Sequence, residues 1–340
     1  MDKNIEWNNL GFGYYPTDYN VRCYYRDGKW GELEISSSEY IPIHIAATSL
    51  HYGQEAFEGL KAYRGKDGKI RLFRWDENAK RLQQSAEGVM MAQVPLELYK
   101  EAIFKAILLN EKFVPPYGIG ASLYVRPLLI GTGAEVGVRP AKEYLFMVFV
   151  TPVGPYFKEG FNPTKIAIIR DSDRAAPLGT GTFKVGGNYA ASLRGIKKAQ
   201  GSGYSNPMYL DCCKREYIDE VGAANFFAIK GNTYITPKSS SILASITNKS
   251  LIQLAEDMGL KVERRPVHID ELSSFDEVGM CGTAAVISPI GEIFDIDNSK
   301  AYKYCNDGKA GAVSTKLYNM LTGIQFGEVE DKHKWTTIVK

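Results

Sequence analysis

Residues Phe57–Gly65 (FEGLKAYRG) and Lys69–Trp75 (KIRLFRW) carry β-branched and aromatic side chains on either side of a Gly-Lys-Asp-Gly turn. This pattern predicts a β-hairpin over residues 55–75. Asp76 follows directly, and we expect it to cap a helix that runs to about Met91. A hairpin that leads into a helix indicates a chain that mixes both kinds of secondary structure.

Further segments continue this mixture of strands and helices. Helices are predicted at 97–112, 188–200 and 248–258, and Gly259 is expected to end the last of them. Strands are predicted at 122–129, 144–150, 165–170, 208–212, 217–229 and 233–236, with two more in 277–293 about Pro289. Short strands interleaved with a few helices predict a mixed α/β or α+β fold.

The length of the chain, 340 residues, favours two domains. Turn-forming residues are concentrated just after residue 153, where the sequence reads GPYFKEG. We therefore predict an N-terminal domain over 1–153, a linker over 154–160 and a C-terminal domain over 161–340.

Composition and missing motifs exclude several classes of function. Lys plus Arg number 41 against 39 Asp plus Glu, a net charge of +2, so neither nucleic acid nor a membrane surface is expected as a partner. The sequence has no GxGxxG, P-loop, GxSxG or HExxH pattern and no zinc-like cysteine spacing, so no metal site is expected. Five cysteines without CxxC, and first residues without a signal-peptide profile, predict a cytoplasmic protein.

A single lysine, Lys184, stands among glycines and small residues in GTGTFKVGGNY (Gly179–Tyr189). On its own, this segment fits a mobile surface loop with a solvated lysine. It also fits a lysine that forms an imine with a carbonyl cofactor. A pyridoxal site would require a carboxylate for the ring nitrogen, a donor for the ring oxygen and an anion cradle for the phosphate.

Six blocks occur in order over essentially the whole chain: SLHYGQEAFEGLKAYRG (49–65), LFRWDENAKRLQQSA (72–86), SLYVRPLLIGTG (122–133), FKVGGNYAAS (183–192), DEVGAANFF (219–227) and CGTAAVISP (281–289). In sequence and spacing they resemble the branched-chain amino acid aminotransferases, which are class IV pyridoxal 5′-phosphate enzymes. The resemblance implies a two-domain fold-type IV enzyme, similar to D-amino acid aminotransferase. It implies a smaller α/β N-terminal domain, a larger β-rich C-terminal domain and the cofactor between them.

The resemblance also implies a cofactor site. Lys184 matches the Schiff-base lysine, which would also carry the proton during transamination. Glu220 matches the carboxylate that keeps the ring nitrogen protonated, although alone it would be taken for a surface glutamate at a strand end. Tyr189 matches the phenol beside the ring oxygen. Without the resemblance, it would be interpreted as a core residue of the helix that follows.

The phosphate is implied to bind an arginine and a helix N-terminus. Arg81 matches the family's phosphate-binding arginine, in a position where an isolated arginine would usually face solvent. The backbone N–H groups of Ile246 and Thr247, together with Thr283, match the rest of the cradle. Free N–H groups and the helix dipole favour an anion there.

The implied substrate pocket is mostly apolar. Its lining matches Phe12, Tyr52, Phe57, Tyr124, Ala223, Ala284 and Ala285. Backbone N–H groups of the two last alanines, with help from Tyr124, are implied to bind the α-carboxylate, and Arg126 the second carboxylate of glutamate. Core packing is the alternative for each aromatic residue. Because the family's equivalents of Tyr52 and Val136 reach the site across a subunit boundary, the resemblance implies a homodimer.

Some positions depart from the family. Animal members carry a redox CxxC after the Gly-Thr-Ala turn, but this sequence has Ala285 and Ser288 there, so redox control through that pair is not expected. Ala223 replaces a threonine found in those relatives, and Trp75 and Ala79 also differ from the usual residues near Arg81.

The implied reaction is a ping-pong transfer of the amino group from L-leucine, L-isoleucine or L-valine to 2-oxoglutarate, giving a branched-chain 2-oxo acid and L-glutamate. Two alternatives remain. One is another class IV activity, a D-amino acid aminotransferase or an aminodeoxychorismate lyase, against which the HYGxxxFEGLKAYRG block argues. The other is a non-enzymatic relative that binds a small ligand, which the intact lysine, glutamate and arginine disfavour.

Overall fold

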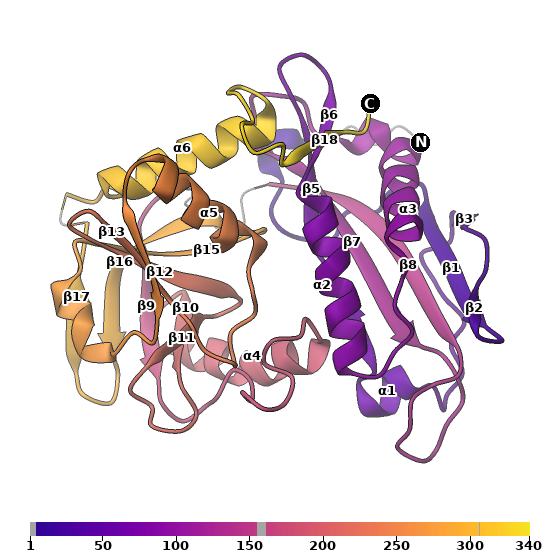
Figure 1. Cartoon of the computed structure of the whole chain (residues 1–340), viewed down its shortest axis with the longest axis horizontal. Helices are drawn as coiled ribbons and strands as arrows, with labels where there is room; N and C mark the ends of the chain where they lie inside the picture. The colour runs from indigo at the N-terminus through magenta and orange to yellow at the C-terminus, as the bar shows by residue number, and fades with distance from the viewer. Residues whose placement is uncertain (1–4, 155–160, 306) are drawn as a thin grey trace. The chain divides into compact units, whose positions relative to one another are not determined.

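The computed structural model describes residues 5–154, 161–305 and 307–340 (Figure 1). They fall into two compact units. Unit 1 takes its described residues from Met1–Lys158, Phe183–Gly186 and Gly323–Lys340, and unit 2 takes them from Glu159–Thr182 and Gly187–Thr322. The segment that carries Lys184 is grouped with unit 1, whereas the sequence-based division assigns it to 161–340. Apart from Gly154, the predicted linker lies outside the described residues, and the domain boundaries stay a prediction.

Within the described part of unit 1, a nine-stranded sheet has the order β18-β6-β5-β7-β8-β1-β2, with β3 paired to β1 and β4 to β7. All of its strand pairs are antiparallel. The strands are β1 (Asn20–Arg26), β2 (Lys29–Trp30), β3 (Glu34–Ser36), β4 (Glu55–Phe57), β5 (Leu60–Arg64), β6 (Ile70–Phe73), β7 (Ser122–Gly131), β8 (Tyr144–Val153) and β18 (Thr336–Ile338). The predicted hairpin is confirmed as β5–β6.

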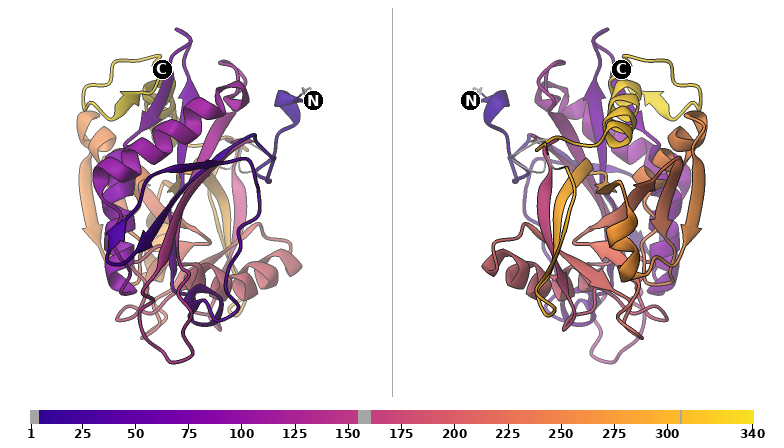
Figure 2. Two further views of the ribbon diagram at one scale, coloured as in Figure 1. Left: turned by 90° about the vertical axis from the view of Figure 1, so that its right-hand side faces the viewer. Right: turned by 90° about the vertical axis from the view of Figure 1, so that its left-hand side faces the viewer.

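Two helices cover one face of this sheet, and α3 can be followed across the strands in Figure 2 (left). They are α2 (Trp75–Gly88) and α3 (Leu96–Leu109), accompanied by α1 (Thr48–Tyr52) and the 3-10 turns η1 (Trp7–Asn9) and η2 (Glu111–Phe113). Leu72 of the sheet, Leu82 of α2 and Ile103 of α3 are fully buried in one apolar core. This burial drives the packing.

The predicted start of α2 is wrong by two residues. Its N-cap is Arg74, in a left-handed conformation with φ 48°, and Asp76 lies in the first turn. An acidic residue there still interacts favourably with the positive end of the helix dipole, which explains why the sequence resembles a cap.

In unit 2, the described residues also form a nine-stranded sheet, with the order β11-β10-β9-β16-β15-β12-β13-β14 and β17 paired to β16. Three of its pairs are parallel, namely β9–β10, β9–β16 and β13–β14, so the sheet is mixed. The strands are β9 (Thr164–Ile169), β10 (Asn206–Leu210), β11 (Ile218–Val221), β12 (Ala224–Lys230), β13 (Thr233–Pro237), β14 (Lys261–Arg265), β15 (Glu277–Gly282), β16 (Val286–Asp295) and β17 (Lys300–Lys303).

One strand prediction in unit 2 is wrong, and the boundary between two others is misplaced. Residues 217–229 form not one strand but the hairpin β11–β12, because Gly222 adopts φ +58° and reverses the chain. The two strands predicted within 277–293 are confirmed as β15 and β16, but the break between them is at 283–285, and Pro289 lies inside β16, opposite Gly279. A register shift between Ile290 and Glu292 lies next to it in the ladder with β9, and proline is often found near such irregular points.

The remaining helices are α4 (Gly186–Gly201), α5 (Ile246–Asp257), α6 (Ala312–Phe326) and the 3-10 helix η3 (Ile269–Ser274). The predicted Gly259 signal is confirmed: it adopts φ +80° directly after the C-cap of α5. Over the described ranges, every helix is too short or too polar to cross a lipid bilayer. The mixed fold class predicted from the sequence is confirmed.

Candidate active site

The backbone of Lys184 is fixed within unit 1. Its N–H donates to Ser85 Oγ on α2 at 2.9 Å, and its carbonyl accepts from the N–H of Phe57 on β4 at 3.1 Å. The Lys184 Nζ lies 4.6 Å from the centroid of the Phe57 ring. Sequence analysis missed Ser85, although it lies inside the LQQSA block. Lys184 therefore has a defined position against an aromatic ring, and the interpretation as a free surface loop does not hold.

Three further predicted substrate residues are linked to Phe57 through Arg126. Arg126 Cζ lies 4.8 Å from the Phe57 ring centroid, and Arg126 Nη2 donates to Tyr124 Oη at 3.0 Å. Phe12 contacts Tyr124 edge-on, with centroids 5.1 Å apart. Gly59 makes room for this cluster, because a Cβ there would clash with Tyr124 Oη. Unit 1 thus brings Lys184, Phe12, Phe57, Tyr124 and Arg126 together.

The Arg126 guanidinium retains hydrogen-bonding capacity. Its Nε atom is buried and has no hydrogen-bond partner among the residues that the structure describes. A buried donor without a partner costs free energy, about 1–3 kcal/mol, and a bound carboxylate would recover it. The geometry therefore fits an anionic ligand group at Arg126.

Glu55 on β4 is a charged residue of this region that sequence analysis missed. Its carboxylate accepts a hydrogen bond from the N–H of Gly186, two residues after Lys184. Burial raises the pKa of the Glu55 carboxyl above its usual range, while this N–H and the positive charges of Arg126 and Lys184 act in the opposite direction. No signal in the sequence distinguishes it from a solvent-exposed glutamate.

Arg81 lies on α2 and is buried, not solvated. Its Nε and Nη2 donate to the two oxygens of Glu58 at 2.7 and 2.8 Å, in a fork-like pair. Asn78 Nδ2 also donates to Glu58, at 2.7 Å. A guanidinium has five N–H donors, so this pair is compatible with a second anion such as phosphate. Sequence analysis missed Glu58, although it belongs to the FEG motif.

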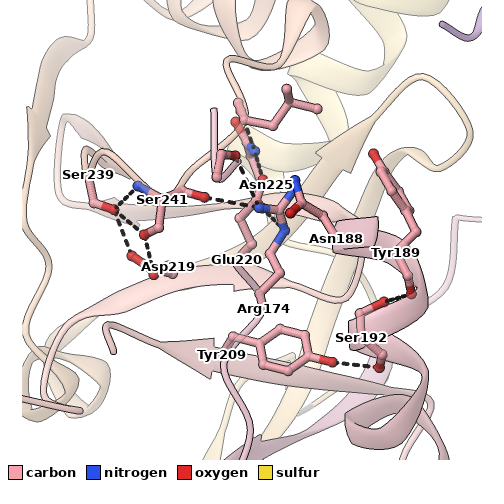
Figure 3. A network of polar contacts seen from close by, with 12 residues as sticks. Arg174, Asn188, Tyr189, Ser192, Tyr209, Asp219, Glu220, Asn225, Ser239 and Ser241 are labelled. Carbon is pink, nitrogen blue, oxygen red and sulfur yellow. Dashed lines mark hydrogen bonds and ion pairs between the residues drawn. The ribbon is translucent and has the colours of Figure 1, made fainter. Parts of the chain in front are cut away.

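In unit 2, Glu220 lies near the end of β11 and is 1% exposed. Arg174, which follows β9, forms an ion pair with Glu220 Oε2, and Asn225 Nδ2 donates to Oε1 at 2.6 Å. Figure 3 shows the Arg174 guanidinium directed at Glu220 in the same network as Asn225 and Ser241. The surface interpretation of Glu220 is therefore wrong. Sequence analysis missed Arg174 and Asn225.

The other predicted cofactor residues also lie in unit 2. Tyr189 is half-buried on α4. Ile246 and Thr247 are the first two residues of α5, whose N-cap Ser245 accepts from the N–H of Asn248 at 3.1 Å. The first N–H groups of a helix have no intrahelical acceptor, so this end suits an anion.

Two turns of unit 2 carry the remaining predicted residues. Ala223 lies in the turn between β11 and β12, and Thr283, Ala284 and Ala285 connect β15 to β16. The next residue, Val286, has φ +58°, which a β-branched residue rarely adopts. Strained backbone of this kind is concentrated at functional sites.

Tyr52 and Val136 meet in unit 1, where Tyr52 Oη donates to the carbonyl of Val136. Both side chains are exposed, Tyr52 by 42% and Val136 by 85%. In the described ranges, no cluster of three or more His, Cys, Asp or Glu residues could hold a metal ion.

The chain belongs to the class IV amino-transferase family, whose model matches residues 55–293. It is 48% identical to a branched-chain-amino-acid aminotransferase of Haemophilus influenzae, over 99% of this chain and 100% of that protein. A Helicobacter pylori protein with the same description is 49% identical, over 98% of this chain and 97% of its own length.

Solved structures agree with this family. The branched-chain amino acid aminotransferase of Escherichia coli matches with a TM-score of 0.79 at 28% identity, covering 95% of this chain and 100% of that chain. The T.th. enzyme of the same description, solved with pyridoxamine 5′-phosphate, matches with a TM-score of 0.78 at 25% identity, covering 95% and 99%. The fold and the aminotransferase class expected from the sequence are confirmed.

Proposed function

We propose that this aminotransferase uses pyridoxal 5′-phosphate to transfer the amino group of L-leucine, L-isoleucine or L-valine to 2-oxoglutarate. The products are the branched-chain 2-oxo acid and L-glutamate. The position of Lys184 carries this proposal, because β4 and α2 hold it against Phe57, whose ring also contacts Arg126. The relatives described above support the choice of substrates.

The described residues offer the groups that this cofactor needs. Glu220 offers a buried carboxylate to the ring nitrogen, and Arg81, Thr283 and the N-terminus of α5 offer donors to the phosphate. Tyr189 would supply the hydroxyl beside the ring oxygen. Bound pyridoxal phosphate supplies an electron-withdrawing ring, which stabilises the electron pair left on the substrate when its Cα loses a proton.

Lys184 transfers the proton in this proposal, and residues of both sequence ranges bind the substrate. The amine of Lys184 takes the proton from the substrate Cα and later returns it, as a general base and then an acid. The Phe57 ring excludes water from one side of Nζ. Tyr124 helps to orient the substrate α-carboxylate, which the N–H groups of Ala284 and Ala285 bind.

Specificity follows from the aromatic and alanine lining. Phe12, Phe57, Tyr124 and Ala223 favour an aliphatic side chain, and each methylene contributes only about 1–3 kcal/mol. Glutamate and 2-oxoglutarate use the same site, with Arg126 pairing with their second carboxylate. The buried Nε of Arg126 supports this assignment.

We place Tyr52 and Val136 in the active site of the partner subunit of a homodimer. Their exposure and their mutual hydrogen bond support this proposal. All five cysteines are free thiols, which fits a reducing, cytoplasmic location.

The assignment of Lys184 is tested by borohydride, which fixes the cofactor covalently to the lysine that holds it. We expect reduction to label the wild type and the exposed control Lys66→Ala, but not Lys184→Ala. We also expect Lys184→Ala to lose about 10³-fold or more in turnover. Wild-type turnover in Lys184→Ala would remove this residue from the mechanism.

The substrate assignment is tested by amino-donor profiles with 2-oxoglutarate as acceptor. We expect L-leucine, L-isoleucine and L-valine to be used, and D-alanine not. A preference for D-alanine would favour a D-amino acid aminotransferase, and pyruvate release from aminodeoxychorismate would favour the lyase.

A further inference from the structure

Arg174 lies outside the six sequence blocks that resemble the family. It forms an ion pair with Glu220, the carboxylate proposed for the ring nitrogen. The side chains of the Arg174–Glu220 pair are 5% and 2% exposed. Arg174 forms an ion pair with one oxygen of the carboxylate and Asn225 donates a hydrogen bond to the other, so both partners come from unit 2 itself. Glu220 therefore lies in a pocket prepared for a negative charge.

Burial makes this counter-charge necessary. A buried carboxylate without a cationic partner is strongly disfavoured and takes up a proton instead. A protonated glutamate could not stabilise a proton on a pyridine nitrogen. Glu220 can act on the ring only while it remains ionised, and Arg174 is its cationic partner in this network.

The guanidinium is itself held in place. Arg174 Nη1 donates to the carbonyl of Ser241 at 3.0 Å and, more weakly, to that of Gly181 at 3.5 Å. The Ser241 hydroxyl in turn donates to Asp219 at 2.5 Å, and Ser239 donates to the same carboxylate at 2.9 Å. Figure 3 shows this continuous network. Arg174 cannot turn away from Glu220 without breaking these bonds.

We propose that Arg174 is a positioning residue, which keeps Glu220 ionised and oriented for the ring nitrogen of the cofactor. This inference rests on the proposed function, because it requires Glu220 to contact that nitrogen. It assigns Arg174 no contact with substrate or cofactor.

The test measures the pH at which the visible absorbance of the bound cofactor changes, together with the rate of the half-reaction with L-leucine. A ring without a protonated nitrogen withdraws fewer electrons and holds its neighbouring proton more tightly. For Arg174→Met we therefore expect the absorbance midpoint to rise by about one pH unit or more. We also expect the half-reaction to slow by about 100-fold.

A second variant keeps the test valid if Arg174→Met does not fold. Arg174→Lys keeps the charge but cannot reach Glu220 and Ser241 together, so we expect a smaller shift of the midpoint in the same direction. The double variant Arg174→Met/Glu220→Gln removes both buried charges, so we expect its melting temperature to exceed that of Arg174→Met. Its midpoint is shifted by Glu220→Gln alone and does not test Arg174.

Arg170→Met is the matched control. It removes another arginine from a buried carboxylate of unit 2, Asp295, at 2.7 Å, without touching the proposed site. We expect it to lower the melting temperature and to leave the midpoint unchanged.

An unchanged midpoint and half-reaction in folded Arg174→Met, or in Arg174→Lys if Arg174→Met does not fold, would overturn the proposal while Glu220→Gln still shifts both. If Glu220→Gln also leaves them unchanged, the assignment of Glu220 to the ring nitrogen fails as well. The two failures are therefore distinguishable.

Discussion

Each unit of the molecule contains a buried arginine–carboxylate pair, and the two pairs are used in opposite ways. In unit 1 the pair is Arg81–Glu58, with side-chain exposures of 9% and 0%. In unit 2 it is Arg174–Glu220, with exposures of 5% and 2%. The proposed cofactor ligand is the arginine in unit 1 and the glutamate in unit 2. In each unit, the residue proposed as a cofactor ligand is therefore paired with a buried counter-charge.

The bonding within the two pairs differs accordingly. Glu58 occupies two nitrogens of the Arg81 fork, so the carboxylate fixes the plane of the guanidinium. Arg174 forms an ion pair with Glu220 and donates a hydrogen bond to the carbonyl of Ser241, so a loop fixes the guanidinium, which then orients the carboxylate. In both cases the proposed ligand is held by a group that does not itself bind the cofactor.

The largest effect on stability is expected when the carboxylate of Glu58 is removed. Glu58→Ala leaves the buried Arg81 without its partner, so we expect the free energy of unfolding in urea to fall by about 3–5 kcal/mol. Glu58→Gln should cost less, because it still accepts from Arg81. Glu87→Ala, an exposed change on the same helix, is the control. Wild-type stability in Glu58→Ala would show that the pair is not a structural requirement.

A smaller effect is expected when the asparagine that donates to each carboxylate is removed, and it should differ between the two pairs. Asn78 donates to Glu58 at 2.7 Å and Asn225 donates to Glu220 at 2.6 Å. Each change to alanine removes one hydrogen bond to a charged group, at a cost of about 1.5–3 kcal/mol. We expect Asn78→Ala mainly to weaken the binding of pyridoxal phosphate and Asn225→Ala mainly to slow the half-reaction. Identical changes in both properties would contradict the division of roles.

The smallest effect concerns Glu55, whose pKa is raised because burial disfavours its charge. The folded chain holds this proton more tightly than the unfolded chain does. The group therefore contributes stability below about pH 4 and loses it as the pH rises through the folded pKa. Glu55→Gln is neutral at every pH and still accepts from Gly186. It should raise the melting temperature by roughly 2 °C at pH 8 and leave it unchanged at pH 4. An increase at pH 4 but not at pH 8 would contradict a raised pKa of Glu55.

Local patterns were sufficient to predict much of the fold. The β5–β6 hairpin and the end of α5 depend on residues close in sequence, so turn and cap signals predict them. The break at Gly222 was not predicted, because apolar residues continue on both sides of it. The buried partners Glu58 and Arg174 were missed for a different reason. Glu58 and Arg81 are 23 residues apart and Glu220 and Arg174 are 46 apart, so only the folded chain shows that these charges are buried.

The resemblance to a family predicted the residues of the candidate site but not the residues that support them. It predicted Lys184, Phe57 and Arg126, which unit 1 places together. It also predicted Glu220 and Arg81, but as ligands without their counter-charges. A motif records which residue touches a ligand, whereas the energetic cost of burying that residue is met by neighbours outside the motif.

The strand order of unit 1 has a consequence for biosynthesis. β18 pairs with β6, placing Thr336 opposite Phe73, yet the ribosome makes β18 only after every residue of unit 2. During translation, unit 2 can therefore complete its sheet while β6 still exposes unpaired backbone. An exposed strand edge invites pairing with neighbouring nascent chains. We expect β6 to be the segment through which newly made chains aggregate, and the part of unit 1 most in need of protection by chaperones.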